Sequence, residues 1–499
     1  MGGIRSHAAL RRKRDCLYSC RTAVASAYID RVAGYVSVAR SRCPQHRTAR
    51  RQREGRSMRI GTMSPASAWS MALPNLDTVI RGLLYLYVLS LPFHRLLFVE
   101  RNGFIILLVL LTLWCLVNRG HFFVWTPIHL PLVAFVGWVA FTVPFAAFPL
   151  YSLQELGKLL QQALLFSVVL FFFRDSPYRL RLVWVMMVAL LIISAYGIFE
   201  FKDLIGERPP GLDLAYVTSF TGAEVWLTTY LIMMAPLSYA LFLFESKLYP
   251  RICYGCLLAL GLGCLLFTFS RAGILSLIIE LWLFVWLTKR RIALVIAGGL
   301  TVVTLTAGIS LYLYAASVPG GLNTIPGTTI SPIKATISSL EHRRRIWAFT
   351  LTKLFEHPVM GIGYGKDNFK RVYGKSPKTT DQTQYEVTEA GTHNTYLDIA
   401  LGVGIPGLIL FLWLISRIVT KLLTNFYAAD TAVDKAIALG VTVSVVGISV
   451  RLFFDHMLIG TVALAFWILV ALAMHRPYSK HLQIDAVSKH SEYGKIGAS

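Results

Sequence analysis

Apolar runs of about 20 residues recur along the chain, and they restrict its fold more than any other feature. A helix of that length crosses the hydrocarbon core of a bilayer with its backbone hydrogen bonds satisfied internally. The composition agrees, because 55% of the 499 residues are hydrophobic and only 15% are charged. We therefore predict an all-α polytopic membrane protein.

Twelve runs qualify as membrane-spanning helices, although several are short or contain a charged residue. The first nine lie in residues 71–316 and the last three in residues 395–475. A segment at 317–394 separates them, and it is long enough to predict a functional loop. The predicted spans are 76–95, 103–118, 128–148, 154–173, 180–200, 223–245, 250–269, 271–288, 292–316, 395–416, 435–453 and 457–475.

The segment before the first span, residues 1–70, is strongly basic and has no apolar periodicity. One interpretation is an arm that binds nucleic acid or anionic lipid. The other, favoured by the missing periodicity, is a disordered arm or sequence upstream of a true start at Met58, Met63 or Met71. It is not a secretory signal, because no apolar core follows the basic residues closely.

Lys and Arg residues in the short loops predict the orientation, since cytoplasmic loops carry an excess of them. By this rule both termini, including the tail 476–499, are cytoplasmic. Residues 317–394 and Arg271 then face the opposite side of the membrane, which is the periplasm if the cell is Gram-negative. The basic loop residues are Arg119, Arg174, Arg179, Arg181, Lys247, Arg251, Lys289, Arg290, Arg291, Arg417 and Lys421.

Three groups of residues that can bind phosphate or exchange a proton lie on that predicted outer face. Arg271 opens a span in FTFSRAGIL, Arg343 to Arg345 begin RRRIWAFTLTKLFEHP, and His393 ends the large loop. A guanidinium binds phosphate oxygens in a bidentate fork, and an imidazole exchanges a proton near neutral pH. The alternatives are a snorkelling Arg271, a membrane-surface charge cluster, and a histidine hydrogen-bonded at a helix end.

The large loop also contains a predicted amphipathic helix. Trp347, Leu351, Leu354 and Phe355 recur at helical spacing, and Pro358 follows them. Such a helix suits a membrane surface. At the other end of the loop, Thr392 or Asn394 can cap the helix that follows.

Metal and nucleotide motifs are missing, and we expect no metal ion and no cofactor. The sequence has no D-x-D, no H-E-x-x-H and no zinc-spaced Cys/His cluster. The glycines of GIGYGKDNF have neither the strand nor the helix of a dinucleotide site, so we predict that they shape a turn. Cys253 and Cys256 form a single C-x-x-C inside a span, which favours buried small hydrophobes over a metal site.

Glu280 is an intramembrane carboxylate in LSLIIELWLF. Such groups are costly in a bilayer and are often functional. We expect either a buried pair with a base, with Arg81, Lys158 and Arg451 as the candidates, or a role in transport.

Four sequence motifs occur in a fixed order: FTFSRAGIL, an Arg four residues before Trp347, HPVMGIGYGKDNF and GTHNTYLDIALGVGIPGLILF. By these motifs the chain resembles the O-antigen ligase superfamily of bacterial envelope enzymes, which includes O-antigen ligases, O-antigen polymerases and protein O-oligosaccharyltransferases. The motifs cover about 265–415, and the span pattern extends the likeness to nearly everything after residue 70.

The resemblance implies a helical fold of the lipid-linked-sugar glycosyltransferase (GT-C-like) type and a metal-independent, inverting transfer. It implies a glycan on undecaprenyl diphosphate as donor and, for a ligase, lipid A–core oligosaccharide as acceptor. Membrane lipids are then partners, and nucleic acid is not. The single large loop and short tail favour a ligase over a polymerase or a protein O-oligosaccharyltransferase.

By position, His393 matches the superfamily's histidine and takes the role of catalytic base. Arg271 and Arg343 match its arginines and are expected to bind the diphosphate. Arg345 stays a third candidate, because a small register error changes the choice within the triplet. Beside the histidine, Asn394 and Tyr396 are expected to support substrate binding.

Two other classes of function remain open. A transporter of lipid-linked glycans would explain the twelve spans and Glu280, but not the structured loop with His393. A structural scaffold of an envelope complex would tolerate point changes at the arginines.

Overall fold

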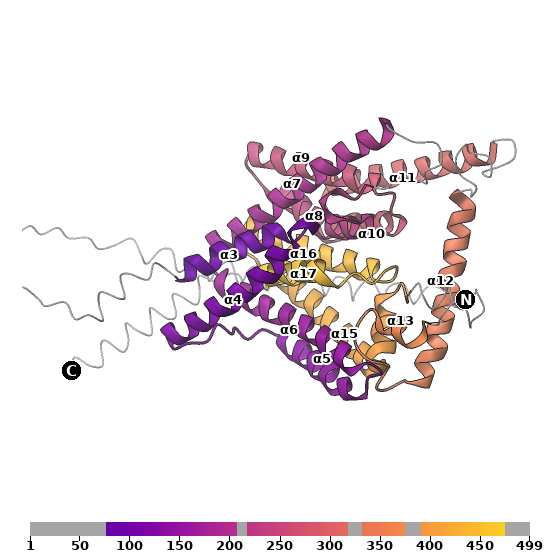
Figure 1. The fold of residues 1–499 in the computed structure, drawn as a ribbon. Coiled ribbons are helices and arrows are strands. Elements are labelled where there is room, and N and C mark those ends of the chain that lie inside the picture. Colours follow the sequence, from indigo (N-terminus) through magenta and orange to yellow (C-terminus); the bar gives the residue numbers. More distant parts are fainter. Residues whose placement is uncertain (1–75, 207–216, 318–331, 375–390, 475–499) are drawn as a thin grey trace, which may run out of the picture. The chain divides into compact units, whose positions relative to one another are not determined.

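A computed structural model describes residues 76–206, 217–317, 332–374 and 391–474 of the chain (Figure 1). The predicted basic arm and the predicted tail lie outside these residues. The described part contains fourteen α-helices and three short 3-10 helices, and no strand. The predicted fold class, a helical polytopic membrane protein, is therefore confirmed.

Each predicted span coincides with one helix. Eight helices among the described residues are long and apolar enough to cross a membrane, and three shorter ones are also apolar. Helix α3 (Leu76–Ser90) is in neither group. The helices that coincide with the twelve predicted spans are α3, α4 (Leu97–Asn118), α5 (His129–Thr142), α6 (Pro149–Phe172), α7 (Ser176–Gly206), α8 (Glu224–Phe244), α9 (Leu248–Phe267), α10 (Arg271–Thr288), α11 (Arg291–Ser317), α15 (Thr395–Ala428), α16 (Ala432–Arg451) and α17 (Gly460–Ala473).

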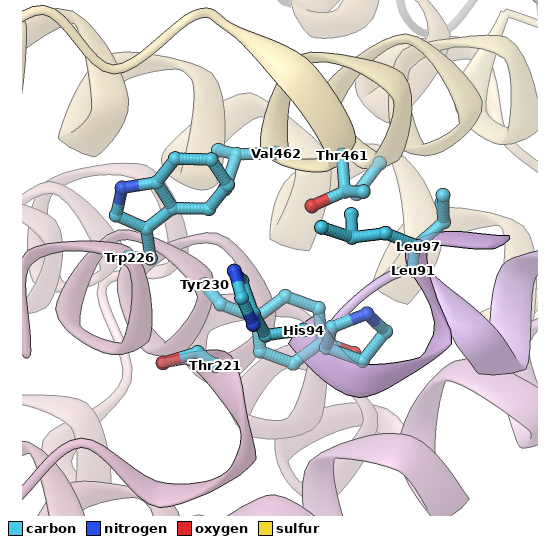
Figure 2. Close-up of a pocket in the computed structure, with 10 residues that line it drawn as sticks. Leu91, His94, Leu97, Thr221, Trp226, Tyr230, Thr461 and Val462 are labelled. Atoms are coloured by element: carbon cyan, nitrogen blue, oxygen red, sulfur yellow. The ribbon is translucent and has the colours of Figure 1, made fainter. Parts of the chain in front are cut away.

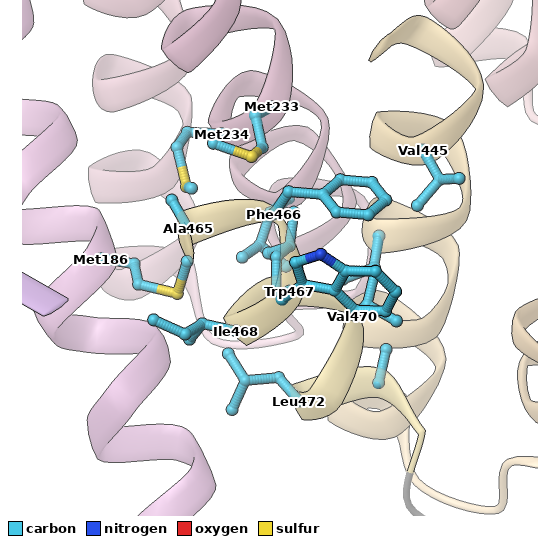
Figure 3. Packing of buried hydrophobic residues seen from close by; sticks show 14 of the residues in the cluster. Met186, Met233, Met234, Val445, Ala465, Phe466, Trp467, Ile468, Val470 and Leu472 are labelled. Carbon is cyan, nitrogen blue, oxygen red and sulfur yellow. The ribbon is translucent and has the colours of Figure 1, made fainter. Parts of the chain in front are cut away.

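Helices α8, α16 and α17 form the centre of the bundle. The span in α8 is 89% buried, whereas that in α4 is 17% buried and leaves its apolar side chains for lipid. Figure 3 shows Met233 and Met234 of α8 close to Phe466 and Trp467 of α17. Lipid tails are as apolar as these side chains, so the hydrophobic effect does not drive the helices together inside a bilayer. Dispersion between closely packed side chains stabilises the helix contacts instead.

The contact between α8 and α16 depends on a small residue. A Cβ atom on Gly440 of α16 would collide with the backbone of Leu237 in α8. The close approach also lets the Ser444 hydroxyl donate to the carbonyl of Met233 at 2.7 Å. Small residues play this role in many membrane helix pairs.

Two helices lie in the predicted large loop: α12 (Pro332–Glu356) and α13 (Asn368–Tyr373). In Figure 1, α12 crosses one end of the bundle, which we call the loop end. The predicted amphipathic helix is therefore present. Leu354 is buried with Phe369 of α13 and Leu401 of α15, while Phe355 stays exposed.

The glycines of GIGYGKDNF shape a turn, as predicted. Gly361, Gly363 and Gly365 all have positive φ, between 67° and 130°. The turn is bound to α15, because the Gly363 amide donates to the Gly402 carbonyl at 2.8 Å.

Helix α15 is not a continuous span, because its backbone breaks at Val403 and Gly404. Gly404 has φ 77° and ψ 174°, a conformation that is nearly exclusive to glycine. The Trp138 indole donates to the freed carbonyl of Val403 at 2.8 Å. The Ile405 amide donates to the carbonyl of Pro358 at 2.8 Å. The break therefore fastens the large loop to the bundle.

We expect Gly404→Ala to destabilise the protein by more than the roughly 1–3 kcal/mol that such a backbone conformation costs. The added Cβ would also collide with the carbonyl of Val359. Gly391→Ala is the matched control, since Gly391 has a similar φ of 78° but a Cβ added there would have nothing within 4 Å. Melting temperatures of the purified proteins test this, and equal losses for both variants would contradict it.

The predicted burial of two cysteines is wrong, and so is one of the two alternatives for Glu280, the buried pair with a base. Cys253 and Cys256 are exposed on α9 rather than buried, because α9 lies at the edge of the bundle. Glu280 is 1% exposed, and neither carboxylate oxygen has a hydrogen-bond partner among the described residues. Its expected partners are engaged elsewhere: Arg81 with Asp77, Lys158 with Glu155, and Arg451 with Asp455.

Candidate functional site

A cavity of about 850 Å³ opens at the loop end and brings three predicted residues together. Arg271 at the start of α10, Arg343 on α12 and His393 just before α15 all line it. Its volume is within the roughly 300–1,000 Å³ of ordinary ligand pockets. The other predicted residues, Arg345, Asn394 and Tyr396, do not line it.

The cavity carries an excess of positive charge. Four arginines line it, Arg271, Arg343, Arg344 and Arg451, against the carboxylates of Glu224 and Asp455. Arg271 and Arg344 are exposed, and neither has a hydrogen-bond partner within the described segments. Their guanidinium groups are therefore available to an anionic ligand.

Asp455 is the organising residue of this cavity. It lies between α16 and α17 and is 14% exposed. One carboxylate oxygen lies 3.0 Å from Arg451 Nη2, and the other lies 3.3 Å from His393 Nδ1 and 3.9 Å from Arg343 Nη2. A single carboxylate thus orients two arginines and the histidine.

Arg451 is almost fully enclosed, with 3% of its side chain exposed. Such a buried cation needs its partner carboxylate, because desolvation of an unpaired charge is expensive. Arg343 is held differently, since its Nη1 donates to the carbonyl of Phe454 at 2.6 Å. Both contacts converge on the short segment that carries Asp455.

His393 is positioned by its backbone as well as by Asp455. Its φ of 47° is unusual for a residue other than glycine. The next residue, Asn394, caps α15 through its side-chain oxygen, which accepts from the amides of Tyr396 at 3.0 Å and Leu397 at 3.1 Å. Thr395 then donates to the Asp455 carbonyl at 2.8 Å. The predicted cap is therefore confirmed at Asn394.

The carboxylate also determines which nitrogen of His393 is free. A carboxylate only accepts hydrogen bonds, so the proton of a neutral imidazole belongs on Nδ1, facing Asp455. Nε2 is then left with its lone pair. The side chain is 38% exposed, so a ligand in the cavity can reach that nitrogen.

The remaining predicted residues have local contacts. Arg345 donates to Glu341 at 2.7 Å on the exposed side of α12, and this bond lowers the pKa of Glu341. The Tyr396 hydroxyl donates to the Ser449 carbonyl at 2.8 Å, which attaches α15 to α16. Asn394 and Tyr396 therefore support the segment around His393.

Sequence reasoning missed Asp455 and Arg451 as members of this site. The available signal was the acid–histidine pair in RLFFDHML, which interrupts two apolar spans. Trp347 and Leu351 of the amphipathic helix also line the cavity and give it an apolar wall. A separate cavity of about 10 Å³ beside His94 and Trp226 has room for about one water molecule (Figure 2).

Fold and site together define a multi-pass helical membrane protein with a cationic cavity that contains a histidine–carboxylate pair. Residues 256–412 match the model of the O-antigen ligase family, a range that contains Arg271, Arg343 and His393. This segment of the chain is therefore similar to the O-antigen ligase family.

Two rickettsial proteins, each named "Putative polysaccharide ligase", are similar to part of the chain. The Rickettsia felis protein is 31% identical over 100 residues, which is 19% of this chain and 25% of that protein. The Rickettsia conorii protein is 32% identical over 83 residues, 17% of this chain and 20% of that protein. The chain thus spans about a quarter or less of the length of these curated relatives.

Proposed function

We propose that this protein is an O-antigen ligase, which transfers O-antigen polysaccharide from undecaprenyl diphosphate to lipid A–core oligosaccharide in lipopolysaccharide biosynthesis. The observation that carries the proposal is the meeting of Arg271, Arg343 and His393 around one cavity. The family match over 256–412 and the names of the rickettsial relatives support it. The loop charges support an inner-membrane location with the cavity facing the periplasm.

In this proposal the arginines bind the diphosphate of the donor. The exposed guanidinium of Arg271 and that of Arg343 stabilise the negative charge that grows on the leaving group. Bidentate Arg–phosphate contacts also fix its orientation. The apolar wall of Trp347 and Leu351 suits the first part of a polyprenyl chain.

His393 acts as the general base on the acceptor. Its free Nε2 takes the proton of the attacking sugar hydroxyl, while Asp455 stabilises the imidazolium that forms. The hydroxyl oxygen bonds to the anomeric carbon as the bond from that carbon to the diphosphate breaks. The diphosphate leaves with the electron pair, and the single displacement inverts the anomeric centre.

A reconstitution tests this assignment. Purified protein and undecaprenyl-diphosphate-linked polysaccharide are incubated with lipid A–core in one tube and with more donor alone in another. We expect a ladder of glycosylated lipid A–core in the first tube only. Longer lipid-linked chains in the second tube would instead make the protein a polymerase, and no product in either would contradict transfer.

Two of the three arginines of α12, Arg343 and Arg345, make a matched pair within the same assay. We expect Arg343→Ala to lower turnover about 10- to 100-fold, because a hydrogen bond to a charged group contributes about 1.5–3 kcal/mol. Arg345→Ala should change turnover less than about threefold, since its exposed pair with Glu341 is worth little. The reverse order of effects would move the diphosphate contact to Arg345.

A further inference from the structure

A second cavity, of about 290 Å³, lies beside the first and is not used by the mechanism above. It is formed by α4, α5, α6, α8, α15 and α17 and by the turn at Tyr364 to Lys366. Lys366 is exposed at its mouth, whereas Gln162 and Asp398 are 9% and 8% exposed. The cavity therefore leads from a polar opening to a buried polar interior.

The two cavities share three segments of the chain as a common wall. On three segments, residues at most two positions apart line different cavities. The first residue of each pair lines the first cavity and the second lines the second cavity. The pairs are Val225 and Trp226 on α8, His393 and Thr395 at the start of α15, and Asp455 and His456 between α16 and α17.

Polar side chains in the second cavity are already held in place. Gln161 Nε2 donates to Glu100 Oε1 at 2.9 Å, and the Trp467 indole donates to Gln162 Oε1 at 3.1 Å. Each fixed amide or carboxylate keeps unused donors or acceptors. Burying such groups in an apolar bundle is costly, so their gathering in one cavity indicates a polar ligand.

The charges of the lining residues indicate that the ligand of this cavity is not a phosphate. No arginine lines the second cavity, and its carboxylates, including those of Glu100, Glu155 and Asp398, outnumber the lysines Lys158 and Lys366. Aromatic rings complete the lining. Amides, carboxylates and flat rings suit the hydroxyls and the apolar faces of an uncharged sugar.

We propose that the second cavity holds one sugar unit of the acceptor, while the neighbouring sugar presents its hydroxyl to His393 in the first cavity; this rests on the transfer reaction proposed above. A single displacement needs the nucleophile on the side opposite the leaving group. With the diphosphate in the arginine-lined cavity, the acceptor has to arrive from the other side of the His393 segment. The second cavity lies there, behind Thr395 and His456.

The test compares two glutamines of the same helix. Gln161 lines the second cavity, whereas Gln154 is exposed on α6 and lines neither cavity. The probe is lipid-free core oligosaccharide, titrated calorimetrically into the full chain in detergent. We expect Gln161→Ala to weaken binding about tenfold, as one lost hydrogen bond implies, and Gln154→Ala to leave it unchanged. Lys366→Ala, at the exposed mouth, serves if Gln161→Ala does not fold.

Kinetics separate this inference from the transfer reaction itself. In the transfer assay, Gln161→Ala should raise KM for lipid A–core about tenfold and leave KM for the donor unchanged. A rise in donor KM alone, equal losses for both glutamine variants, or no oligosaccharide binding by the wild-type chain would overturn the assignment. Binding that depends on Gln161 without any transfer would support the sugar cavity and reject the proposed reaction.

Discussion

His393→Ala is expected to lower the transfer rate by about 10²- to 10⁴-fold, the usual contribution of a general base, without loss of folded protein. The side chain is 38% exposed, and its one hydrogen bond among the described residues is to Asp455. Its removal therefore leaves no cavity in the core. The measurement is initial-rate transfer to lipid A–core by detergent-purified protein, normalised to its amount.

The matched control for this variant is His357→Ala. His357 follows α12, is exposed, and lines neither cavity, so its loss should leave the rate unchanged. Donor binding should also survive His393→Ala, because the arginines remain. Wild-type turnover in His393→Ala would remove the histidine from the mechanism. A transporter or a scaffold predicts that result.

The helical layout could be read from the sequence because one property decides it. A run of about 20 apolar residues satisfies both the bilayer and its own backbone only as a helix. Each predicted range accordingly coincides with a helix, from α3 to α17. The cap at Asn394 and the turn at Gly361 also follow from local residue chemistry.

The contacts that join distant segments could not be predicted in this way. The break at Gly404 is stabilised by Trp138 and Pro358, which lie far from it in the sequence. Asp455 was overlooked for the same reason, because its partners are on three different segments. For Glu280, charge complementarity predicts a basic partner as one of two alternatives. The fold instead places Gly447 against the Glu280 carboxylate.

The direction in which each arginine of the triplet points depends on its position on the helix. Arg343, Arg344 and Arg345 are equivalent in composition, yet consecutive helical residues point in different directions. The structure turns Arg343 and Arg344 to the cavity and Arg345 to Glu341. Only the position of α12 on the bundle could resolve this choice.

Asp455→Asn should reduce both stability and transfer. The neutral amide leaves Arg451, which is 3% exposed, without its counter-charge, and breaking such a buried pair costs about 3 kcal/mol or more. The amide also fails to fix the proton of His393 on Nδ1 or to stabilise its charged form. We therefore expect a lower melting temperature together with a fall in turnover of about 10²-fold or more.

A double-mutant cycle distinguishes a positioning role from simple loss of folding. If Asp455 acts through His393, then Asp455→Asn should cost little further turnover once His393 is replaced by alanine, while still lowering the melting temperature. A purely structural carboxylate would instead lower turnover by the same factor in both backgrounds. Additive losses in turnover would thus reject the coupling, and Asp455 would then serve only to neutralise the buried Arg451.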